Sequence, residues 1–187
     1  MILTLDVETT FIKTDKGSDP SPYAEGNQLV SVGFKEDDKP VEYVWFYHAD
    51  RPPTENNMQI VQDALDRTDV LLGHNIKFDL QWLFATGFTY SGAVYDTMVF
   101  DYVWARGVKV PLSLDECCRR HQTPTKKKKG ILEKYLQDGM GFDIIPHDIV
   151  EEYGIADVQS TYEVALSQSK QEGKSIEQIA AYTVPVF

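Results

Sequence analysis

The order of structural patterns along the chain constrains its fold more than any other feature. Runs rich in β-forming residues come first, at Met1–Val7, Leu29–Phe34 and Val41–Phe46, and turn-forming stretches separate them. From Thr54 onward helical periodicity dominates, interrupted by a short apolar strand at Val70–Gly73. The sequence has no internal repeat, so the pattern predicts one α/β or α+β unit in which a mixed sheet is flanked by helices.

Helices are expected where apolar residues recur every three or four positions. Gly87 follows one such pattern and Pro146 begins another. Ser113 is expected to cap a helix through a capping box with Glu116, and Asp96 is expected to cap the helix that follows it. The predicted helices span about Thr54–Thr68, Ile76–Phe84, Asp96–Trp104, Ser113–His121 and Pro146–Lys170, and the polar stretch Thr14–Asn27 is predicted as a loop.

Composition places the chain among globular proteins and limits its partners. Of its 187 residues, 42% are hydrophobic and 25% are charged, which excludes a disordered chain, a collagen and a disulfide scaffold. The formal net charge of -11 repels phosphate backbones at long range, so non-specific coating of nucleic acid is not expected. A local site could still bind nucleic acid if cations cancelled carboxylate charge at the point of contact.

The cysteines and the first residues bear on the cellular location. Cys117 and Cys118 are sequence neighbours, which favours neither a disulfide nor a shared metal and fits a reducing compartment. The residues after Met1 lack the basic region of a secretory signal, and no apolar run approaches the roughly 18 residues that span a bilayer. We therefore expect a cytoplasmic protein with no membrane partner.

Two acids lie on the first predicted strand, in the segment Leu5-Asp-Val-Glu-Thr9. Because side chains alternate along a strand, Asp6 and Glu8 point to the same face. Two carboxylates this close resist joint ionisation unless a cation lies between them, and oxygen donors favour Mg²⁺ or Mn²⁺. The alternative is an exposed strand face that carries two solvated acids.

Two later segments place polar residues one helical turn apart. In the segment Gly73–Asp79, Asn75 and Asp79 lie at the start of a predicted helix and share one of its faces. Tyr153 and Asp157 have the same spacing on the last predicted helix. Each pair has a structural alternative, in which Asn75 is an N-cap and Tyr153 packs in the core while Asp157 faces water.

The three segments together resemble the motifs of the DEDDy proofreading exonucleases. Asp-x-Glu on the first strand, Asn-x-x-x-Asp after a middle strand and Tyr-x-x-x-Asp on a late helix occur in the family's order, from Asp6 to Asp157. The segments Gly73–Asp79 and Tyr95–Met98 also resemble the 3′–5′ exonuclease domains of family A DNA polymerases, especially bacteriophage ones. The resemblance implies a ribonuclease-H-like α/β fold with a mixed five-stranded sheet flanked by helices. For a phage protein, the location would be the cytoplasm of the bacterial host.

The resemblance also implies the chemistry of the site. Asp6, Glu8, Asp79 and Asp157 would hold two divalent cations, Mg²⁺ or Mn²⁺, and Tyr153 would orient the attacking water. The substrate would be the 3′ end of single-stranded or frayed DNA. Hydrolysis would release nucleoside 5′-monophosphates one at a time, in the service of proofreading.

Residues beside the acids are candidates for holding the substrate. The resemblance implies that Thr9, Phe11 and Ile12 contact the terminal sugar and base, although core packing at the strand end explains the two apolar side chains equally well. Asn75 and Phe78 would line the same groove, where stacking holds single-stranded DNA.

One basic cluster stands out in this acidic chain, and it consists of Lys126, Lys127, Lys128 and Lys129. It is predicted to lie in a polar loop. There the four lysines would be either a solvated surface segment or a contact that guides the DNA strand.

The resemblance leaves the wider context open. Residues 1–180 are expected to form the exonuclease domain, and residues 181–187 to begin a linker to a polymerase domain in the same or an associated chain. One alternative is an RNA 3′-trimming enzyme of the ribonuclease D type. Another is a non-catalytic exonuclease-like module that binds nucleic acid or protein, which the intact set of acids argues against.

Overall fold

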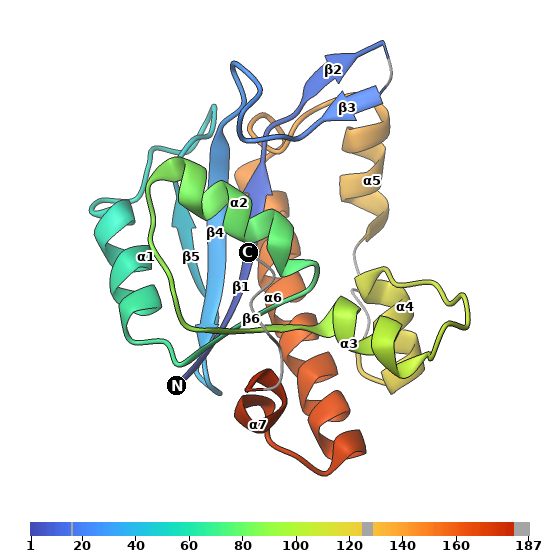
Figure 1. The fold of residues 1–187 in the computed structure, drawn as a ribbon. Coiled ribbons are helices and arrows are strands. Elements are labelled where there is room, and N and C mark those ends of the chain that lie inside the picture. Colours follow the sequence, from blue (N-terminus) through green and yellow to red (C-terminus); the bar gives the residue numbers. More distant parts are fainter. Residues whose placement is uncertain (16, 125–128, 182–187) are drawn as a thin grey trace.

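A five-stranded mixed sheet forms the core of the computed structural model, which describes residues 1–15, 17–124 and 129–181 (Figure 1). Its strands are β1 (Ile2–Thr9), β4 (Leu29–Glu36), β5 (Glu42–Trp45), β6 (Val70–Gly73) and β7 (Ala93–Asp96). They lie in the order β5-β4-β1-β6-β7. β4 runs antiparallel to both of its neighbours, whereas β1, β6 and β7 run parallel to one another.

Helices cover both faces of this sheet, as the sequence pattern predicts. They are α1 (Asn57–Asp66), α2 (Ile76–Thr86), α3 (Thr97–Trp104), α4 (Leu114–His121), α5 (Lys129–Gln137), α6 (His147–Glu172) and α7 (Ile176–Ala180). Side chains along β6 point alternately to the two faces of the sheet. Leu71 packs on one face in a core with α1 and α2, while Val70 and Leu72 pack on the other face in a core with α6 and α7. In Figure 1 part of the long helix α6 lies beside β1, with which it is in contact.

The same alternation decides which side chains of β1 face α6. Leu3, Leu5 and Val7 are buried in the core formed with α1 and α2. The residues between them therefore point to the opposite face, toward α6. Asp6 and Glu8 are two of those residues, so the strand presents both acids to the long helix.

The carboxylate of Asp96 binds backbone N–H groups at the starts of the two helices that follow β6 and β7. Asp96, the last residue of β7, accepts hydrogen bonds from the backbone N–H groups of Asn75 (3.0 Å) and Ile76 (3.1 Å) at the start of α2. It also accepts one from Met98 (2.9 Å) in α3, so the predicted cap of α3 is confirmed and the same side chain caps α2 as well. Asn75 itself adopts a left-handed conformation (φ 62°) with no side-chain cap bond.

Several short elements differ from the sequence-based expectations. The stretch Thr14–Asn27 is not all loop, because β2 (Ile12–Thr14) and β3 (Gly17–Asp19) form a hairpin. β7 and α7 were not anticipated, and α5 begins where the sequence predicts only a polar loop. These elements are too short, or too polar, to show clear periodicity.

The capping box expected at Ser113 does not form. Ser113 is the N-cap residue of α4 but makes no side-chain cap bond. Glu116, its expected partner, instead forms an ion pair with Arg119. Among the described helices, none combines the length and the apolar character needed to cross a membrane.

Candidate active site

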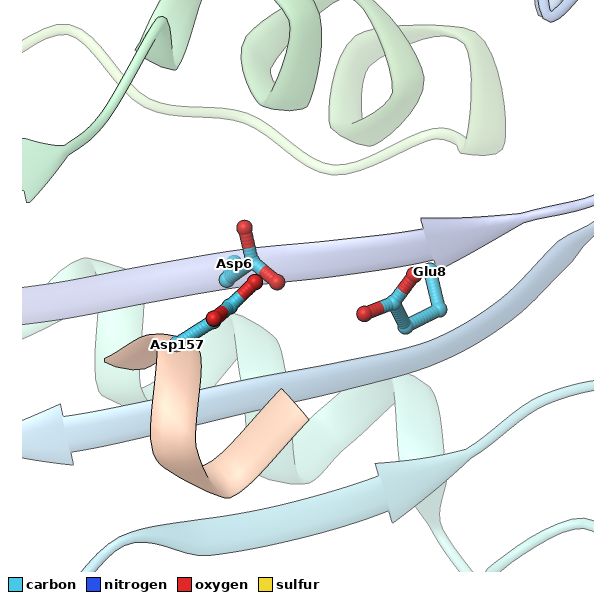
Figure 2. A group of neighbouring side chains, drawn as sticks. All are labelled: Asp6, Glu8 and Asp157. Atoms are coloured by element: carbon cyan, nitrogen blue, oxygen red, sulfur yellow. The ribbon is translucent and has the colours of Figure 1, made fainter. Parts of the chain in front are cut away.

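Three carboxylates from two distant parts of the chain meet between β1 and α6. Asp6 and Glu8 come from β1, and Asp157 comes from the middle of α6. One carboxylate oxygen of each lies within 4.8 Å of one carboxylate oxygen of the other two. Figure 2 shows the side chains gathered on one face of the strand. Glu8 and Asp157 are buried, and Asp6 is half-buried.

Close packing between the sheet and α6 brings Asp157 to the strand. The ring of Tyr43 in β5 lies between two glycines, since a Cβ atom added at Gly33 of β4 would be 3.3 Å from it, and one added at Gly154 of α6 only 2.6 Å. Any side chain at Gly154 would therefore push the helix outward. Asp157 lies one turn further along the same helix, so its distance from β1 depends on this contact.

Tyr43 is also a polar link between the sheet and the helix. Its hydroxyl lies 2.7 Å from Oγ of Ser31 and donates a hydrogen bond of 3.4 Å to the carbonyl of Val150 in α6. Burial, followed by the nearby charge of Glu8, holds the pKa of this phenol well above its usual range. Tyr43 therefore stays protonated and keeps its donor.

The fourth predicted acid, Asp79, stands beside this group on the first turn of α2. It is buried, and its Oδ1 accepts a hydrogen bond of 3.0 Å from the N–H of Val7. The pairing of β1 with β6 ends at Thr4, so this bond satisfies an N–H group beyond the part of β1 that pairs with β6. Burial and the charge of Asp6 raise the pKa of the Asp79 carboxyl well above its usual range.

Tyr153 lies one helical turn before Asp157 and is half-buried. Its ring packs against Phe142, with the ring centroids 6.1 Å apart. Burial raises the pKa of its phenol further above 10, and the charges of Glu8 and Asp6 add to the shift. The hydroxyl is therefore a hydrogen-bond donor at neutral pH, beside the carboxylates.

The residues predicted to hold the substrate differ in burial, and only Phe11 and Ile12 line the cavity beside the end of β1. Phe11 and Ile12 line a cavity of about 340 Å³ between the end of β1 and the loop before α6. Thr9 is buried in the last position of β1, and Asn75 is exposed at the start of α2. Phe78 is partly buried and packs against the core, so for this residue core packing explains much of its placement.

The basic cluster falls mostly on a part of the chain without a described structure. Lys126, Lys127 and Lys128 lie outside the described residues. Lys129 is not in the predicted polar loop, because it is the first residue of α5, and only its backbone is described. The DNA contact predicted for these four lysines stays a prediction.

The donor set fits divalent cations. Carboxylates this close repel one another when all are ionised, and the raised pKa of Asp79 reflects that repulsion together with burial. A bound divalent cation would reverse the sign of the interaction, and an all-oxygen donor set suits Mg²⁺ or Mn²⁺. The chemistry of the residues therefore matches the cations that the sequence implies.

Two residues with a part in this geometry escaped the sequence-based prediction. Tyr43 looked like an ordinary strand residue, and its position between two glycines depends on the packing of β5 against α6. Gly154 carried a usable signal, because glycine inside a long helix lowers helix stability by about 1 kcal/mol and suggests a packing reason.

A helix-covered mixed sheet with acids on its central strand defines the ribonuclease-H-like exonuclease fold. Residues 18–171 match the 3′-5′ exonuclease family, and the chain belongs to that family. The matched range contains Asp79, Tyr153 and Asp157, and it begins after the two acids of β1. Among curated proteins, no sequence matches the chain.

Solved structures share the fold at low sequence identity. Brucella melitensis NrnC is 16% identical, with a TM-score of 0.61, and the alignment covers 97% of this chain and 80% of NrnC. Exonuclease X in complex with 5′ overhanging duplex DNA is 14% identical (TM-score 0.53), with coverage of 97% and 98%. The POL domain structure of Pol1 from M. smegmatis is 12% identical (TM-score 0.56), and the alignment covers 89% of this chain and 24% of Pol1.

Proposed function

We propose that this 3′-5′ exonuclease is a two-cation enzyme that hydrolyses the 3′ ends of single-stranded or frayed DNA and proofreads for a DNA polymerase. The observation that carries the proposal is the meeting of Asp6, Glu8 and Asp157 within 4.8 Å, with Asp79 beside them. Asp79 has a structural role as the acceptor for the N–H of Val7, but the close approach of Asp6, Glu8 and Asp157 costs like-charge repulsion when no cation is bound. They form a suitable site for cations that bind a phosphodiester.

Each acid has a distinct part in the proposal. Asp6, which lies close to Glu8 and Asp157 and whose charge acts on Asp79, would contact both cations, and Glu8 and Asp157 would complete the ligands of one of them. Asp79, which already accepts the N–H of Val7, would act on the second through water. When bound, two divalent cations stabilise the attacking and leaving oxygens of an in-line displacement.

Tyr153 would position the attacking water. Its phenol is protonated at neutral pH because burial and the neighbouring carboxylates raise its pKa, so it donates a hydrogen bond and does not act as a base. In the reaction the water oxygen bonds to the terminal phosphorus, and the bond from phosphorus to the upstream O3′ breaks. O3′ takes up a proton, and a nucleoside 5′-monophosphate leaves.

The polymerase context is supported by resemblance and by one structural likeness. The segments around Asp79 and Asp96 resemble the exonuclease domains of family A polymerases, and the chain aligns with part of a much longer polymerase, Pol1 of M. smegmatis. In this proposal residues 1–180 form the exonuclease domain. Residues 182–187 lie outside the described residues.

An RNA-trimming function is the second candidate. NrnC, which has the same fold, has been solved with bound Mg²⁺ and bound to pGG, a different ligand from the duplex DNA of exonuclease X. DNA and RNA oligonucleotides of one sequence, competing in a single digestion, separate the two functions because only RNA carries the 2′-OH. Faster loss of the RNA would favour the trimming enzyme.

The main test replaces one acid at a time. Asp6→Asn and Asp157→Asn should each abolish the digestion of an end-labelled single strand in Mg²⁺, and calorimetry should show weaker Mg²⁺ binding. Neither variant should unfold earlier than the unaltered chain without Mg²⁺, because each removes like-charge repulsion. Asp148→Asn is the matched control, an exposed acid in the first turn of the same helix. Near-full digestion by either test variant would exclude that residue from the mechanism.

A further inference from the structure

An exposed aromatic side chain lies at the end of the sheet nearest the acids. Tyr47 directly follows the Trp45–Phe46 segment at the end of β5 and is 49% exposed. Its backbone N–H donates a hydrogen bond of 3.1 Å to the carbonyl of Val30, which fixes its position at the start of β4. A single exposed apolar ring is common on protein surfaces, so the meaning of Tyr47 depends on the cavities around it.

Tyr47 lines a cavity beside the end of β1. One wall of this cavity of about 340 Å³ begins at Thr10, two residues after Glu8. The opposite wall contains Gly141 and Asp143, which flank Phe142, and the ring of Phe142 packs against Tyr153. The lining thus comes within two residues of Glu8 in the sequence and includes both neighbours of Phe142, the residue that packs against Tyr153. The volume is at the lower end of the range of about 300–1,000 Å³ that is usual for ligand pockets.

A second cavity shares two of its lining residues with the first. It has a volume of about 330 Å³ and is lined by Phe46 and Trp82 among others. Tyr47 and Asn27 line both cavities. The two hollows therefore adjoin at Tyr47, and together they extend from the end of β1 past the end of β5. A chain of nucleotides longer than the terminal one would need a path of this kind.

The lining of the two cavities contains aromatic side chains and little positive charge. The chain has a net charge of -11, and Lys13 is the only positively charged residue among the described residues that line the two cavities. Nζ of Lys13 lies against Gly139, which lines the same cavity. With so little positive charge, base stacking on aromatic rings has to supply much of the grip.

We infer that Tyr47 stacks on a base of the strand upstream of the 3′-terminal nucleotide, and that Lys13 contacts a phosphate of the same strand. The inference rests on the proposed exonuclease function and deepens it, because it assigns the path of the substrate beyond the cleaved nucleotide. Stacking is tolerant of sequence, so the contact would hold any strand presented to the acids.

The test measures how the effect of Tyr47→Ala depends on substrate length. For an oligonucleotide of about eight nucleotides, KM should rise about tenfold, since one stacked base is lost. For a dinucleotide, KM should rise much less, because few of its atoms extend past the acids. Tyr47→Phe keeps the ring and should restore most of the affinity. The logarithm of the binding constant of the octamer falls linearly with the logarithm of the salt concentration, and Lys13→Ala should make this slope shallower by about 0.7.

Tyr102→Ala is the matched control, because Tyr102 is 64% exposed on α3 and lines neither cavity. Equal changes in KM for Tyr47→Ala and Tyr102→Ala, or an equal rise for both substrate lengths, would overturn the inference and leave the exonuclease function standing. Fluorescence anisotropy of a labelled octamer in Mg²⁺ measures binding without digestion, and so tests the inference even if the proposed exonuclease function fails. If the unaltered chain binds the octamer without digesting it, the proposed function fails, and the binding loss in Tyr47→Ala still decides the inference. If it binds no octamer, the inference is overturned.

Discussion

Replacing Gly154 by alanine tests whether the approach of α6 sets the geometry of the acids. At an open helical position this change stabilises a protein by up to about 1 kcal/mol. Here the new Cβ would lie 2.6 Å from the ring of Tyr43, and ordinary contact begins at 3.4 Å, so ring and helix must separate by about 0.8 Å. Tyr43 is buried and hydrogen-bonded to α6, so it cannot swing away without loss. Overpacking of this kind costs about 1–3 kcal/mol.

The displacement should reach Asp157, which lies one turn further on. A misplacement of about 1 Å can cost about 10²-fold in rate, so digestion of a labelled single strand should fall by one to two orders of magnitude, with weaker Mg²⁺ binding by calorimetry. Gly130→Ala is the matched control, a helical glycine in α5 with no neighbouring atom within 4 Å of an added Cβ. By urea unfolding, Gly154→Ala should be less stable than this control by about 2 kcal/mol. Equal stability and activity of the two variants would refute the argument.

Tyr153→Phe keeps the ring against Phe142 and removes the hydroxyl, so kcat should fall by about 10²-fold with KM nearly unchanged in single-turnover and steady-state digestion. An unchanged kcat would remove the hydroxyl from the mechanism. Burial alone would raise the pKa of Asp101, but hydrogen bonds led by that from His121 lower it to about 2. Because this pKa is below the ordinary 3.8, the carboxylate stabilises the fold above about pH 4, and at most about 2 kcal/mol is lost as the pH falls toward 2. Urea unfolding should show this loss in the unaltered chain and not in Asp101→Asn. Replacing Lys126, Lys127, Lys128 and Lys129 together by alanine should flatten the salt dependence of oligonucleotide binding, and an unchanged slope would place the cluster away from the strand.

The local geometry of the site could be predicted because it depends on short-range periodicity. Strand alternation puts Asp6 and Glu8 on one face, and the spacing of Tyr153 and Asp157 puts both on one side of a helix. No local rule brings α6 to β1, since that contact joins residues about 150 positions apart in the chain. The resemblance to a family supplied the long-range step, and in the structure Asp157 does meet the acids of β1.

The parts that escaped prediction depend on tertiary packing. The β2–β3 hairpin and β7 have three or four residues per strand, too few for a pattern to show. Asp96 was expected to cap one helix, and its second role at α2 exists only because β6 and β7 end side by side. The position of Tyr43 between two glycines likewise requires the assembled sheet and helix.

Three of the four acids that could be recognised from sequence are buried, and burial of a carboxylate opposes folding. Glu8, Asp79 and Asp157 are almost fully buried, although carboxylic acids are seldom buried so deeply in a protein. Such conflicts with packing rules are expected where a protein carries out chemistry. Without cations, the repulsion between these carboxylates opposes folding, so divalent cations that bind only the native state should raise the unfolding temperature. The same cations should have little effect on Asp157→Asn, because that variant lacks one ligand of the group.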